Sequence, residues 1–388
     1  MRKLAKTAVL GLKKGKKAVI VVSAMGKTTD MLASDFQDAC ENKSMPKELD
    51  EVLSMGERIS ARLFAAALNA QGTDARYFDP SDADWPVITD DDFGNAKPVL
   101  DECSRRIENT VLPMLEKGIT PVVPGFVGKT LKGEVTTLGR GGSEITAFVL
   151  ARAIKAKEVV ILTDVDGIMT ADPNIISNSS RLRSIKVGEL VNLCDSGVKF
   201  IRRKALKYLD GSFEVRVRGN RKGKVASQGT VVKGRLPEKP NFLGYPSAVC
   251  MATIVGEAFM NKPKVLANIF KRINNDKVPI LVQSVETDAA HICFPEACIE
   301  ETARAIHSSI LQNKGSAMAL KKQLAFLKIV GVGSENTTKT LKRVIESLDY
   351  RRVRVAGICM IASSILFLVD WAEKDAALAA IEETYEAC

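Results

Sequence analysis

The first part of the chain alternates short runs of β-branched residues with longer stretches in which apolar residues recur at helical spacing. A continuous β-branched run indicates a strand buried on both faces, whereas a period of about 3.6 residues indicates an amphipathic helix. Strands that alternate with helices indicate a mostly parallel sheet with helices on both faces, so we predict an α/β domain. The predicted strands are 17–24, 75–78, 119–124 and 158–163, and the predicted helices are 29–41, 47–70, 98–117 and 143–157.

A change in composition marks the end of this pattern. Residues 219–234 are rich in Gly, Lys and Ser, and residues 236–246 contain three prolines. Such stretches typically separate domains. We therefore predict that residues 1–235 form the α/β domain and that residues 236–246 form a linker.

The remainder of the chain repeats one order of elements twice. In each repeat a strand is followed by a helix, two strands and a second helix, which is the order βαββα of a ferredoxin-like unit. We predict one unit over 247–316 and a second over 317–388. The predicted elements are 248–255, 264–275, 280–286, 290–294 and 299–313, and then 324–332, 337–348, 353–359, 364–370 and 375–385.

Length and composition fit a globular protein of two or three domains. The chain has 388 residues, of which 46% are hydrophobic and 26% charged. No apolar run approaches the length of about 18 residues that a membrane-spanning helix needs, so we expect no membrane partner. The basic start of the chain, residues 1–17, allows a targeting peptide, but its apolar residues share one helical face, which favours a surface helix.

Cysteine, histidine and charge exclude several classes of function. Eight Cys without a C-x-x-C pair, and two His, indicate reduced thiols in a cytoplasmic protein rather than a disulfide scaffold or a zinc site, and we predict no protein-bound metal centre. We expect no histidine catalysis, because His291 and His307 are the only candidates and both lie late in the chain. The formal charge of +10 is dispersed and accompanied by only 5% aromatic residues, so we expect no nucleic-acid partner.

The segment V-V-S-A-M-G-K-T-T-D at 21–30 leads from a strand through a turn into a helix. It ends like a P-loop, but Val21 stands where the spacing G-x-x-x-x-G-K-[ST] requires Gly. Ser23, Thr28 and Thr29 place hydroxyl groups at the carboxyl end of the strand, where open α/β sheets bind ligands. Simple capping of the helix by Thr28 or Thr29 is the alternative.

The predicted helix over 47–70 carries Glu57 within a strongly apolar sequence. A carboxylate in a buried helix is costly unless it is paired, so Glu57 is a candidate for binding a cationic group of a ligand. An ordinary surface glutamate is the alternative interpretation.

The segment T-T-L-G-R-G-G-S-E at 136–144 has the composition of an anion site. Its glycines permit positive φ angles, and Ser143 is a natural N-cap, so the N–H groups of the following helix would face an anion. Arg140 adds a guanidinium group suited to a carboxylate.

Acidic residues follow the predicted strand 158–163, in the sequence T-D-V-D-G-I-M-T-A-D-P-N at 163–174. Thr163, Asp164, Asp166 and Asp172 suit contacts to ribose, an amine or hydrated magnesium. Acidic residues at strand ends also serve loops and caps, and this alternative remains open.

Taken in order and spacing, these four segments resemble the aspartate kinases of the amino-acid kinase superfamily. The family patterns S-A-M-G-x-T-T-D, S-x-G-E, G-R-G-G-S-D and T-D-V-D-G-I-Y-T-A-D-P-R are matched at 23–30, 54–57, 139–144 and 163–174. The tandem units at the C-terminus resemble the ACT domains of that family, so the resemblance covers essentially the whole chain. It implies a three-layer amino-acid kinase domain followed by two ferredoxin-like ACT domains.

The resemblance also implies roles for individual residues. The aspartate pocket would comprise Ser23, Thr29, Glu57, Phe126, Arg140 and Ser143, with Glu57 at the substrate ammonium and Arg140 at a carboxylate. The nucleotide would be held by Thr163, Asp164, Met169, Asp172 and Lys199, and Arg140 and Lys199 would be the catalytic residues.

The implied reaction transfers the γ-phosphoryl group of ATP, with Mg²⁺, to the side-chain carboxylate of L-aspartate. The product, 4-phospho-L-aspartate, is the first intermediate on the way to lysine, threonine and methionine. The ACT pair implies feedback control by an amino acid such as lysine or threonine, and a homodimer formed through these domains.

This sequence departs from the family at several positions. The family's opening strand and its turn K-F-G-G-T-S do not occur in this sequence, and Glu144, Met169 and Asn174 replace Asp, Tyr and Arg. Arg202, Arg203 and Lys204 stand in place of H-P-R. Two interpretations stay open: a true kinase whose first strand is missing because the sequence is truncated, or a catalytically degenerate relative that acts as an amino-acid-sensing regulatory subunit.

Overall fold

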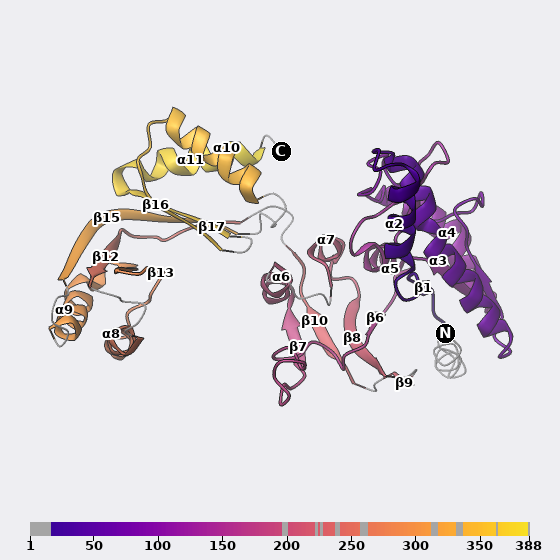
Figure 1. Cartoon of the computed structure of the whole chain (residues 1–388), viewed down its shortest axis with the longest axis horizontal. Coiled ribbons are helices and arrows are strands. Elements are labelled where there is room, and N and C mark those ends of the chain that lie inside the picture. Colours follow the sequence, from indigo (N-terminus) through magenta and orange to yellow (C-terminus); the bar gives the residue numbers. More distant parts are fainter. Residues whose placement is uncertain are drawn as a thin grey trace. The chain divides into compact units, whose positions relative to one another are not determined.

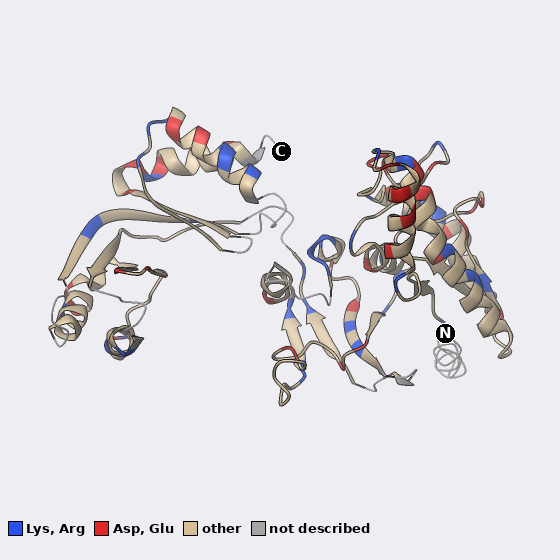
Figure 2. Cartoon of the chain, in the orientation of Figure 1, with Lys and Arg blue, Asp and Glu red and all other residues tan. Residues whose placement is uncertain are grey.

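The computed structural model divides the chain into two compact units, Met1–Glu238 and Lys239–Cys388 (Figure 1). It describes residues 17–195, 201–221, 224–225, 228–236, 241–256, 263–311, 317–330, 337–361 and 364–386. Acidic and basic residues are interspersed along the helices and strands of both units (Figure 2). None of the described helices is both long and apolar enough to span a membrane.

The N-terminal half of the first unit is a small parallel sheet with helices. Its strands lie in the order β1 (Ile20–Val22), β3 (Thr120–Pro124) and β2 (Ala75–Tyr77), and both pairs are parallel. The 24-residue helix α3 (Pro46–Asn69) begins at Pro46. Proline is favoured in the first helical turn, because an N–H group at that position would have no partner within the helix. The other elements are α2 (Thr28–Ala39), α4 (Leu100–Glu116), α5 (Gly142–Ala153) and the hairpin of β4 (Val127–Lys129) and β5 (Val135–Thr137).

The C-terminal half of the first unit is built on a second sheet, with strand order β6–β8–β10–β7. The pairs β6–β8 and β10–β7 are parallel, whereas β8 and β10 are antiparallel. The elements are β6 (Glu158–Thr163), β7 (Ser184–Lys186), α6 (Val187–Asp195), α7 (Arg203–Leu206), β8 (Glu214–Arg221), β9 (Lys224–Val225) and β10 (Thr230–Lys233). The predicted mostly parallel α/β sheet is therefore confirmed, with an antiparallel pair inside it.

One hydrophobic core connects the two halves of the first unit. It joins Phe78 and Trp85 of the N-terminal half to Val215 and Val217 of the C-terminal half, and α5 packs against both β1 and β6. Within the described residues, β1 and β6 are each paired along one edge only. The strand predicted over 17–24 is consequently shorter than expected and half-buried rather than buried.

In the part of the chain that the structure describes, the second unit is one antiparallel sheet with four α-helices. The strands lie in the order β13–β14–β12–β15–β17–β16, and β11 pairs with β15. The strands are β11 (Asn241–Gly244), β12 (Val249–Val255), β13 (Val282–Val285), β14 (Ala289–Pro295), β15 (Ala317–Val330), β16 (Val355–Ile361) and β17 (Ser364–Asp370). The helices are α8 (Pro263–Asn275), α9 (Ile299–Ile310), α10 (Thr337–Tyr350) and α11 (Lys374–Glu386), and short 3₁₀ helices lie at Glu296–Cys298 and Trp371–Glu373.

The long strand β15 belongs to both ferredoxin-like units. Its first part pairs with β12, and its last part pairs with β17 and β11. Residues of β12 that alternate along the strand, such as Ala252 and Ile254, form one core with α8 and α9, whereas Leu327 and Ile329 of β15 form another with α10 and α11. The range predicted as a linker thus contains a strand, β11, whose Phe242 packs against the second of these cores.

Candidate active site

The carboxyl ends of β1 and β3 meet the N-terminus of α5. The backbone N–H of Gly125 donates a hydrogen bond to the Val22 carbonyl at 2.8 Å, which aligns the two strand ends. The Ser23 hydroxyl, directly after β1, donates to the Ser143 hydroxyl of α5, also at 2.8 Å. Two of the predicted site residues, 120 positions apart, are therefore in direct contact.

The close approach of α5 depends on a glycine. A Cβ atom at Gly125 would lie 2.7 Å from the Ser143 Oγ and 2.8 Å from its Cα. The next residue, Phe126, has a φ of +68°, so the chain turns sharply at the end of β3. The predicted pocket residues Phe126 and Ser143 are thus brought together with Ser23.

Ser143 is not the N-cap that the sequence predicted. The helix begins at Gly142, and its N-cap is Gly141 in the left-handed region at φ +82°, with no side-chain cap. The reason is that glycine adopts this φ without cost, so the helix can begin at an earlier residue. The Gly142 N–H donates to the Gly139 carbonyl at 3.0 Å, and the Ser143 hydroxyl accepts from Ser23.

Glu57 of α3 is buried at the same end of the sheet, with 4% of its surface exposed. Its Oε1 accepts a 2.9 Å hydrogen bond from the Ala24 N–H, whereas its buried Oε2 has no hydrogen-bond partner. Burial raises the pKa of Glu57 to about 6, although the hydrogen bond from Ala24 opposes the shift. The alternative of an ordinary surface glutamate is wrong, and the free oxygen suits a cationic ligand group.

Arg140 lies exposed in the turn between β5 and α5. Thr29 lies in the first turn of α2, whose start at Thr28 follows β1 after a short loop. The Thr28 hydroxyl donates to the Met25 carbonyl at 2.7 Å, but the N-cap of α2 is Lys27 and no side chain caps this helix. Capping therefore explains neither Thr28 nor Thr29, and Thr29 stays a candidate.

The predicted nucleotide residues follow β6. Thr163 ends this strand, and its hydroxyl donates to the Asp164 carboxylate at 3.1 Å. Asp172 accepts the backbone N–H of Asn174 at 2.8 Å, so it shapes its own loop, as the alternative interpretation predicted. Met169 forms an isolated β-bridge with Arg181. The predicted catalytic residue Lys199 lies outside the described residues.

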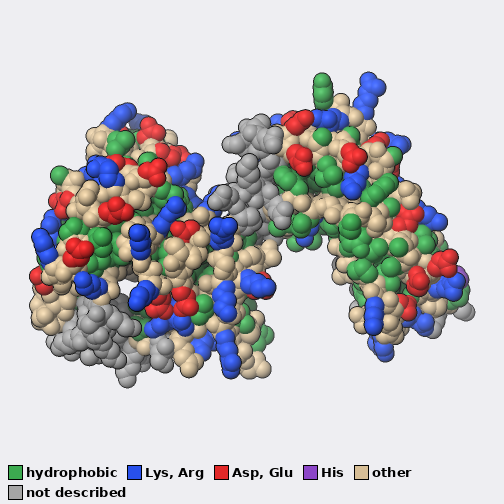
Figure 3. Space-filling view, turned by 180° about the vertical axis from the view of Figure 1, so that it is seen from behind, with side chains coloured by type: hydrophobic (Ala, Val, Ile, Leu, Met, Phe, Trp, Pro, Cys, Tyr) green, Lys and Arg blue, Asp and Glu red, His purple; other side chains and the backbone are tan. Residues whose placement is uncertain are grey.

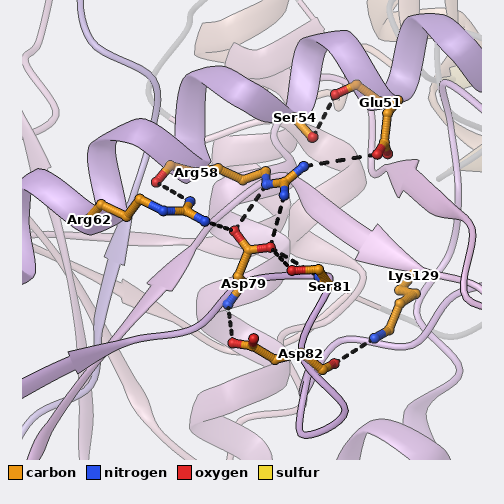
Figure 4. Close-up of polar contacts among 8 residues, drawn as sticks. All are labelled: Glu51, Ser54, Arg58, Arg62, Asp79, Ser81, Asp82 and Lys129. Carbon is orange, nitrogen blue, oxygen red and sulfur yellow. Dashed lines mark hydrogen bonds and ion pairs between the residues drawn. The ribbon is translucent and has the colours of Figure 1, made fainter.

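A buried ion network anchors the loop after β2 (Figure 4). Asp79 accepts hydrogen bonds from Arg58 at 2.9 and 3.0 Å and from Arg62 at 2.6 Å. Burial alone would raise the pKa of Asp79, but the bonds from Arg58, Ser81 and Arg62 outweigh it and hold the pKa well below its ordinary range. This network fixes α3, the helix that carries Glu57, to the carboxyl end of β2.

Sequence reasoning missed this network and two further charged residues, Asp50 and Lys204. Asp50 precedes Glu57 by seven residues on the same buried face of α3, and that spacing was a usable signal. Lys204 carried no such signal, because Leu138 and Asn95, which it binds, lie 66 and 109 positions away.

The chain is similar to several characterised proteins. The sequence model of the amino acid kinase family matches residues 1–219. An aspartokinase of Mycobacterium tuberculosis is 31% identical over 402 residues, covering 99% of this chain and 92% of that protein. An aspartokinase of Geobacillus stearothermophilus is 29% identical and covers 97% of this chain and 90% of that protein.

Solved structures show the same fold. The crystal structure of aspartate kinase from Synechocystis superposes with a TM-score of 0.76 at 23% identity, covering 99% of this chain and 66% of that one. Aspartokinase III of E. coli in complex with lysine and aspartate superposes with a TM-score of 0.52 at 21% identity, covering 98% of this chain and 96% of that one. This chain therefore spans about two thirds of the Synechocystis chain but nine tenths or more of the curated relatives.

Proposed function

Since the chain belongs to the amino acid kinase family, and within it to the aspartokinases, we propose that it transfers the γ-phosphoryl group of ATP to the side-chain carboxylate of L-aspartate. A carboxylate oxygen of aspartate attacks the γ-phosphorus, the bond from that phosphorus to the oxygen bridging to the β-phosphate breaks, and ADP leaves. The product is 4-phospho-L-aspartate. Because the matched relatives are aspartokinases over nearly their whole length, the alternative of a degenerate regulatory subunit is not favoured.

The observation that carries the proposal is the unpartnered carboxylate oxygen of Glu57, buried beside the end of β1. We assign this oxygen to the substrate ammonium group, which is the charge that an isolated buried carboxylate requires. We assign a substrate carboxylate to Arg140 and to the N–H groups at the start of α5, beside Ser143 and Ser23. Phe126 and Thr29 complete this pocket in the proposal.

The nucleotide would bind at the carboxyl end of β6, against Thr163, Asp164 and Met169. In this proposal Asp172 and Lys199 also contact the nucleotide. Mg²⁺ usually keeps several waters and is bound by phosphate oxygens with one or two carboxylates, and Asp164 could be such a carboxylate. The described residues contain no group of three or more His, Cys, Asp or Glu side chains that could hold a metal ion. Bound Mg²⁺ would supply positive charge to the phosphates.

The chemical difficulty of the reaction is electrostatic. Nucleophile and phosphate are both anions, and at about 4 Å with an effective dielectric near 20 each pair of unit charges repels by roughly 4 kcal/mol. Catalysis then consists mostly of positioning and positive charge, with little need for a general base. Arg140, Lys199 and the N-terminus of α5 provide that charge in our proposal.

The second unit is proposed to bind an amino-acid effector and to form a cytoplasmic homodimer. Its fold is shared with E. coli aspartokinase III, whose structure contains lysine and aspartate. Apolar side chains gather on one face of this unit (Figure 3). The edge strand β16 also carries exposed apolar residues, namely Val355, Ile358, Met360 and Ile361. An exposed apolar strand at a sheet edge favours pairing with a second chain.

The function is tested with the purified full chain by trapping the acyl phosphate as a hydroxamate. We expect signal that requires ATP, Mg²⁺ and aspartate together, and that is lost when glutamate or acetylglutamate replaces aspartate. Arg140→Met should lower the rate by about 10²-fold or more, since it removes a charge from the transition state, while Arg105→Met, on the exposed side of α4, is the matched control. A hydroxamate that forms equally well with glutamate would refute the assignment to aspartate.

A further inference from the structure

Asp50 is a fully buried carboxylate on α3 that serves no ligand in the proposed pocket. Its Oδ2 accepts the backbone N–H groups of Gly94 and Thr137, each at 2.8 Å, and its Oδ1 accepts the Thr137 hydroxyl at 2.6 Å. Burial raises the pKa of Asp50, and the bonds from Thr137 and Gly94 oppose that shift. Asp50 therefore joins α3 to the last residue of β5 and to the loop at Gly94.

Lys204 of α7 holds the same two segments from the other half of the first unit. Its Nζ donates to the Leu138 carbonyl at 2.6 Å and to the Asn95 side-chain oxygen at 2.7 Å. It also donates to the Asn95 carbonyl at 3.2 Å. Thr137 and Leu138 are consecutive, so a carboxylate and an ammonium group bind adjacent residues at the start of the turn that carries Arg140.

The two glycines of the turn, Gly139 and Gly141, lie in close contact with neighbouring residues. A Cβ at Gly139 would lie 3.1 Å from the Gly94 carbonyl, and a Cβ at Gly141 would lie 2.6 Å from the Arg202 Cβ. Both glycines have φ angles in the left-handed region, +68° and +82°. The backbone on each side of Arg140 therefore lies directly against Gly94, which Asp50 binds, and against Arg202, two residues before Lys204.

We propose that Asp50 and Lys204 are positioning residues that set the turn 138–142 and thereby aim Arg140 and the start of α5 at the substrate. The proposal rests on the proposed function, because it assigns Arg140 to a substrate carboxylate. Lys204 gives the stronger test, because it lies on α7 in the half that carries the nucleotide residues, yet it binds Leu138 at the start of the turn of the substrate pocket and Asn95 in the neighbouring loop. Asp50 from the N-terminal half and Lys204 from the C-terminal half of the first unit thus both bind residues at the start of the turn 138–142.

The alternative is that both residues only stabilise the fold. A purely structural lysine on α7 would affect its own half when it is removed, and hence the KM for ATP, or would lower the melting temperature alone. A positioning lysine would raise the KM for aspartate and lower kcat while the KM for ATP stays constant. The separation of the two KM values therefore distinguishes the roles.

The test compares Lys204→Met with Lys204→Arg in the full chain. Lys204→Met is expected to lower kcat/KM for aspartate about 10- to 100-fold, the loss typical of a reacting group displaced by about 1 Å, with the KM for ATP within about 2-fold of wild type. Lys204→Arg keeps the charge and donors and should recover most of the loss. The matched control is Lys207→Met, an exposed lysine next to α7, which should leave both KM values unchanged.

Asp50 is tested by Asp50→Asn and Asp50→Leu, with the exposed Glu48→Gln of the same helix as control. Asn keeps an acceptor for the two N–H groups and should lose less than about 3-fold in kcat/KM, whereas Leu removes every acceptor and should match Lys204→Met. If Asp50→Leu does not fold, the Asn and Lys204 variants still decide the question. A rise in the KM for ATP equal to that for aspartate, or wild-type kinetics in Lys204→Met, overturns the proposal.

Amide hydrogen exchange separates this proposal from the proposed function. The Gly142 N–H donates to the Gly139 carbonyl at 3.0 Å and so reports on the closed turn. Lys204→Met should speed its exchange about 10-fold or more while amides in the middle of α5 are unchanged. This holds whether or not wild type produces hydroxamate, so an inactive wild type refutes the function alone, and unchanged exchange at Gly142 refutes the positioning role alone.

Discussion

The Ala24 N–H donates to one carboxylate oxygen of Glu57 at 2.9 Å, and the other oxygen of Glu57 is buried without a hydrogen-bond partner. The backbone just after β1 thus orients the acid of α3 and leaves one oxygen for a ligand. Glu57→Gln should lower kcat/KM for aspartate by about 10- to 100-fold, the range of a lost charge-assisted hydrogen bond. Steady-state kinetics with the isosteric variant measures this, and a loss below about 2-fold would remove Glu57 from the pocket.

The same residue predicts a pH dependence. Because burial raises the pKa of Glu57 to about 6, its carboxylate forms as the pH rises through about 6, and kcat/KM for aspartate should rise with it. Glu57→Gln should abolish this limb of the profile. Profiles of the two proteins between about pH 5 and 8 check the assignment, and a limb that persists in the variant belongs to another group.

The ionised form of Glu57 should also lower the free energy of unfolding when no substrate is bound. The pKa of Glu57 is 4.5 when the chain is unfolded and about 6 when it is folded, so the folded state favours the protonated form. Stability from this group is highest below 4.5 and falls as the pH rises through 6, by on the order of 2 kcal/mol. Glu57→Gln should therefore unfold at higher urea concentration than wild type at about pH 8, with a smaller difference at about pH 5.

Asp79 shows the opposite sign. Its pKa is held below the ordinary value of 3.8, chiefly by Arg58 against the effect of burial, so it stabilises the fold above pH 3.8 and loses that contribution as the pH falls. Asp79→Asn should destabilise the protein by about 3 kcal/mol at neutral pH, because two arginines lose their partner. Urea unfolding measures this. The exposed pair Arg76–Asp84 is the control, and Arg76→Met should cost less than about 1 kcal/mol.

Gly125 tests the contact between β3 and α5. Gly125→Ala places a Cβ 2.8 Å from the Ser143 Cα, so the N-terminus of α5 must move away from the pocket. We expect kcat/KM for aspartate to fall about 10²-fold. Gly188→Ala, where a Cβ meets nothing within 4 Å, is the control and should keep wild-type activity. Equal activity of both variants would show that the pocket tolerates the displacement.

The sequence pattern predicted helices and strands well where the spacing of the apolar residues matches the face that is buried in the structure. The strand expected over 158–163 is found as Glu158–Thr163, and the helix expected over 47–70 is found as Pro46–Asn69. Pairings between distant segments have no local signal, which is why β11 and the double use of β15 were missed.

The candidate site divides in the same way. Ser23, Glu57, Phe126 and Ser143 carry recognisable motifs, and the structure gathers them at one end of a sheet. Lys204 resembles a solvated lysine in the sequence, because it binds groups of Leu138 and Asn95 far away in the chain. The spacing of Asp50 from Glu57 places it on the buried face of α3, but its partners Gly94 and Thr137 have no local signal. The roles of all the site residues remain predictions.

The strand β15 has a consequence for how this protein can be recombined with its relatives. The first part of β15 pairs with β12, and its last part pairs with β17 and β11. A chimaera joined between residues 316 and 317 would therefore take β15 from a different protein than its partner β12. If only the last ferredoxin-like unit were grafted, β15 would have to pair with β12 of one protein and with β17 of the other. We expect that the second unit can be exchanged only as a whole, from β11 onward, and that it melts in a single transition rather than as two modules.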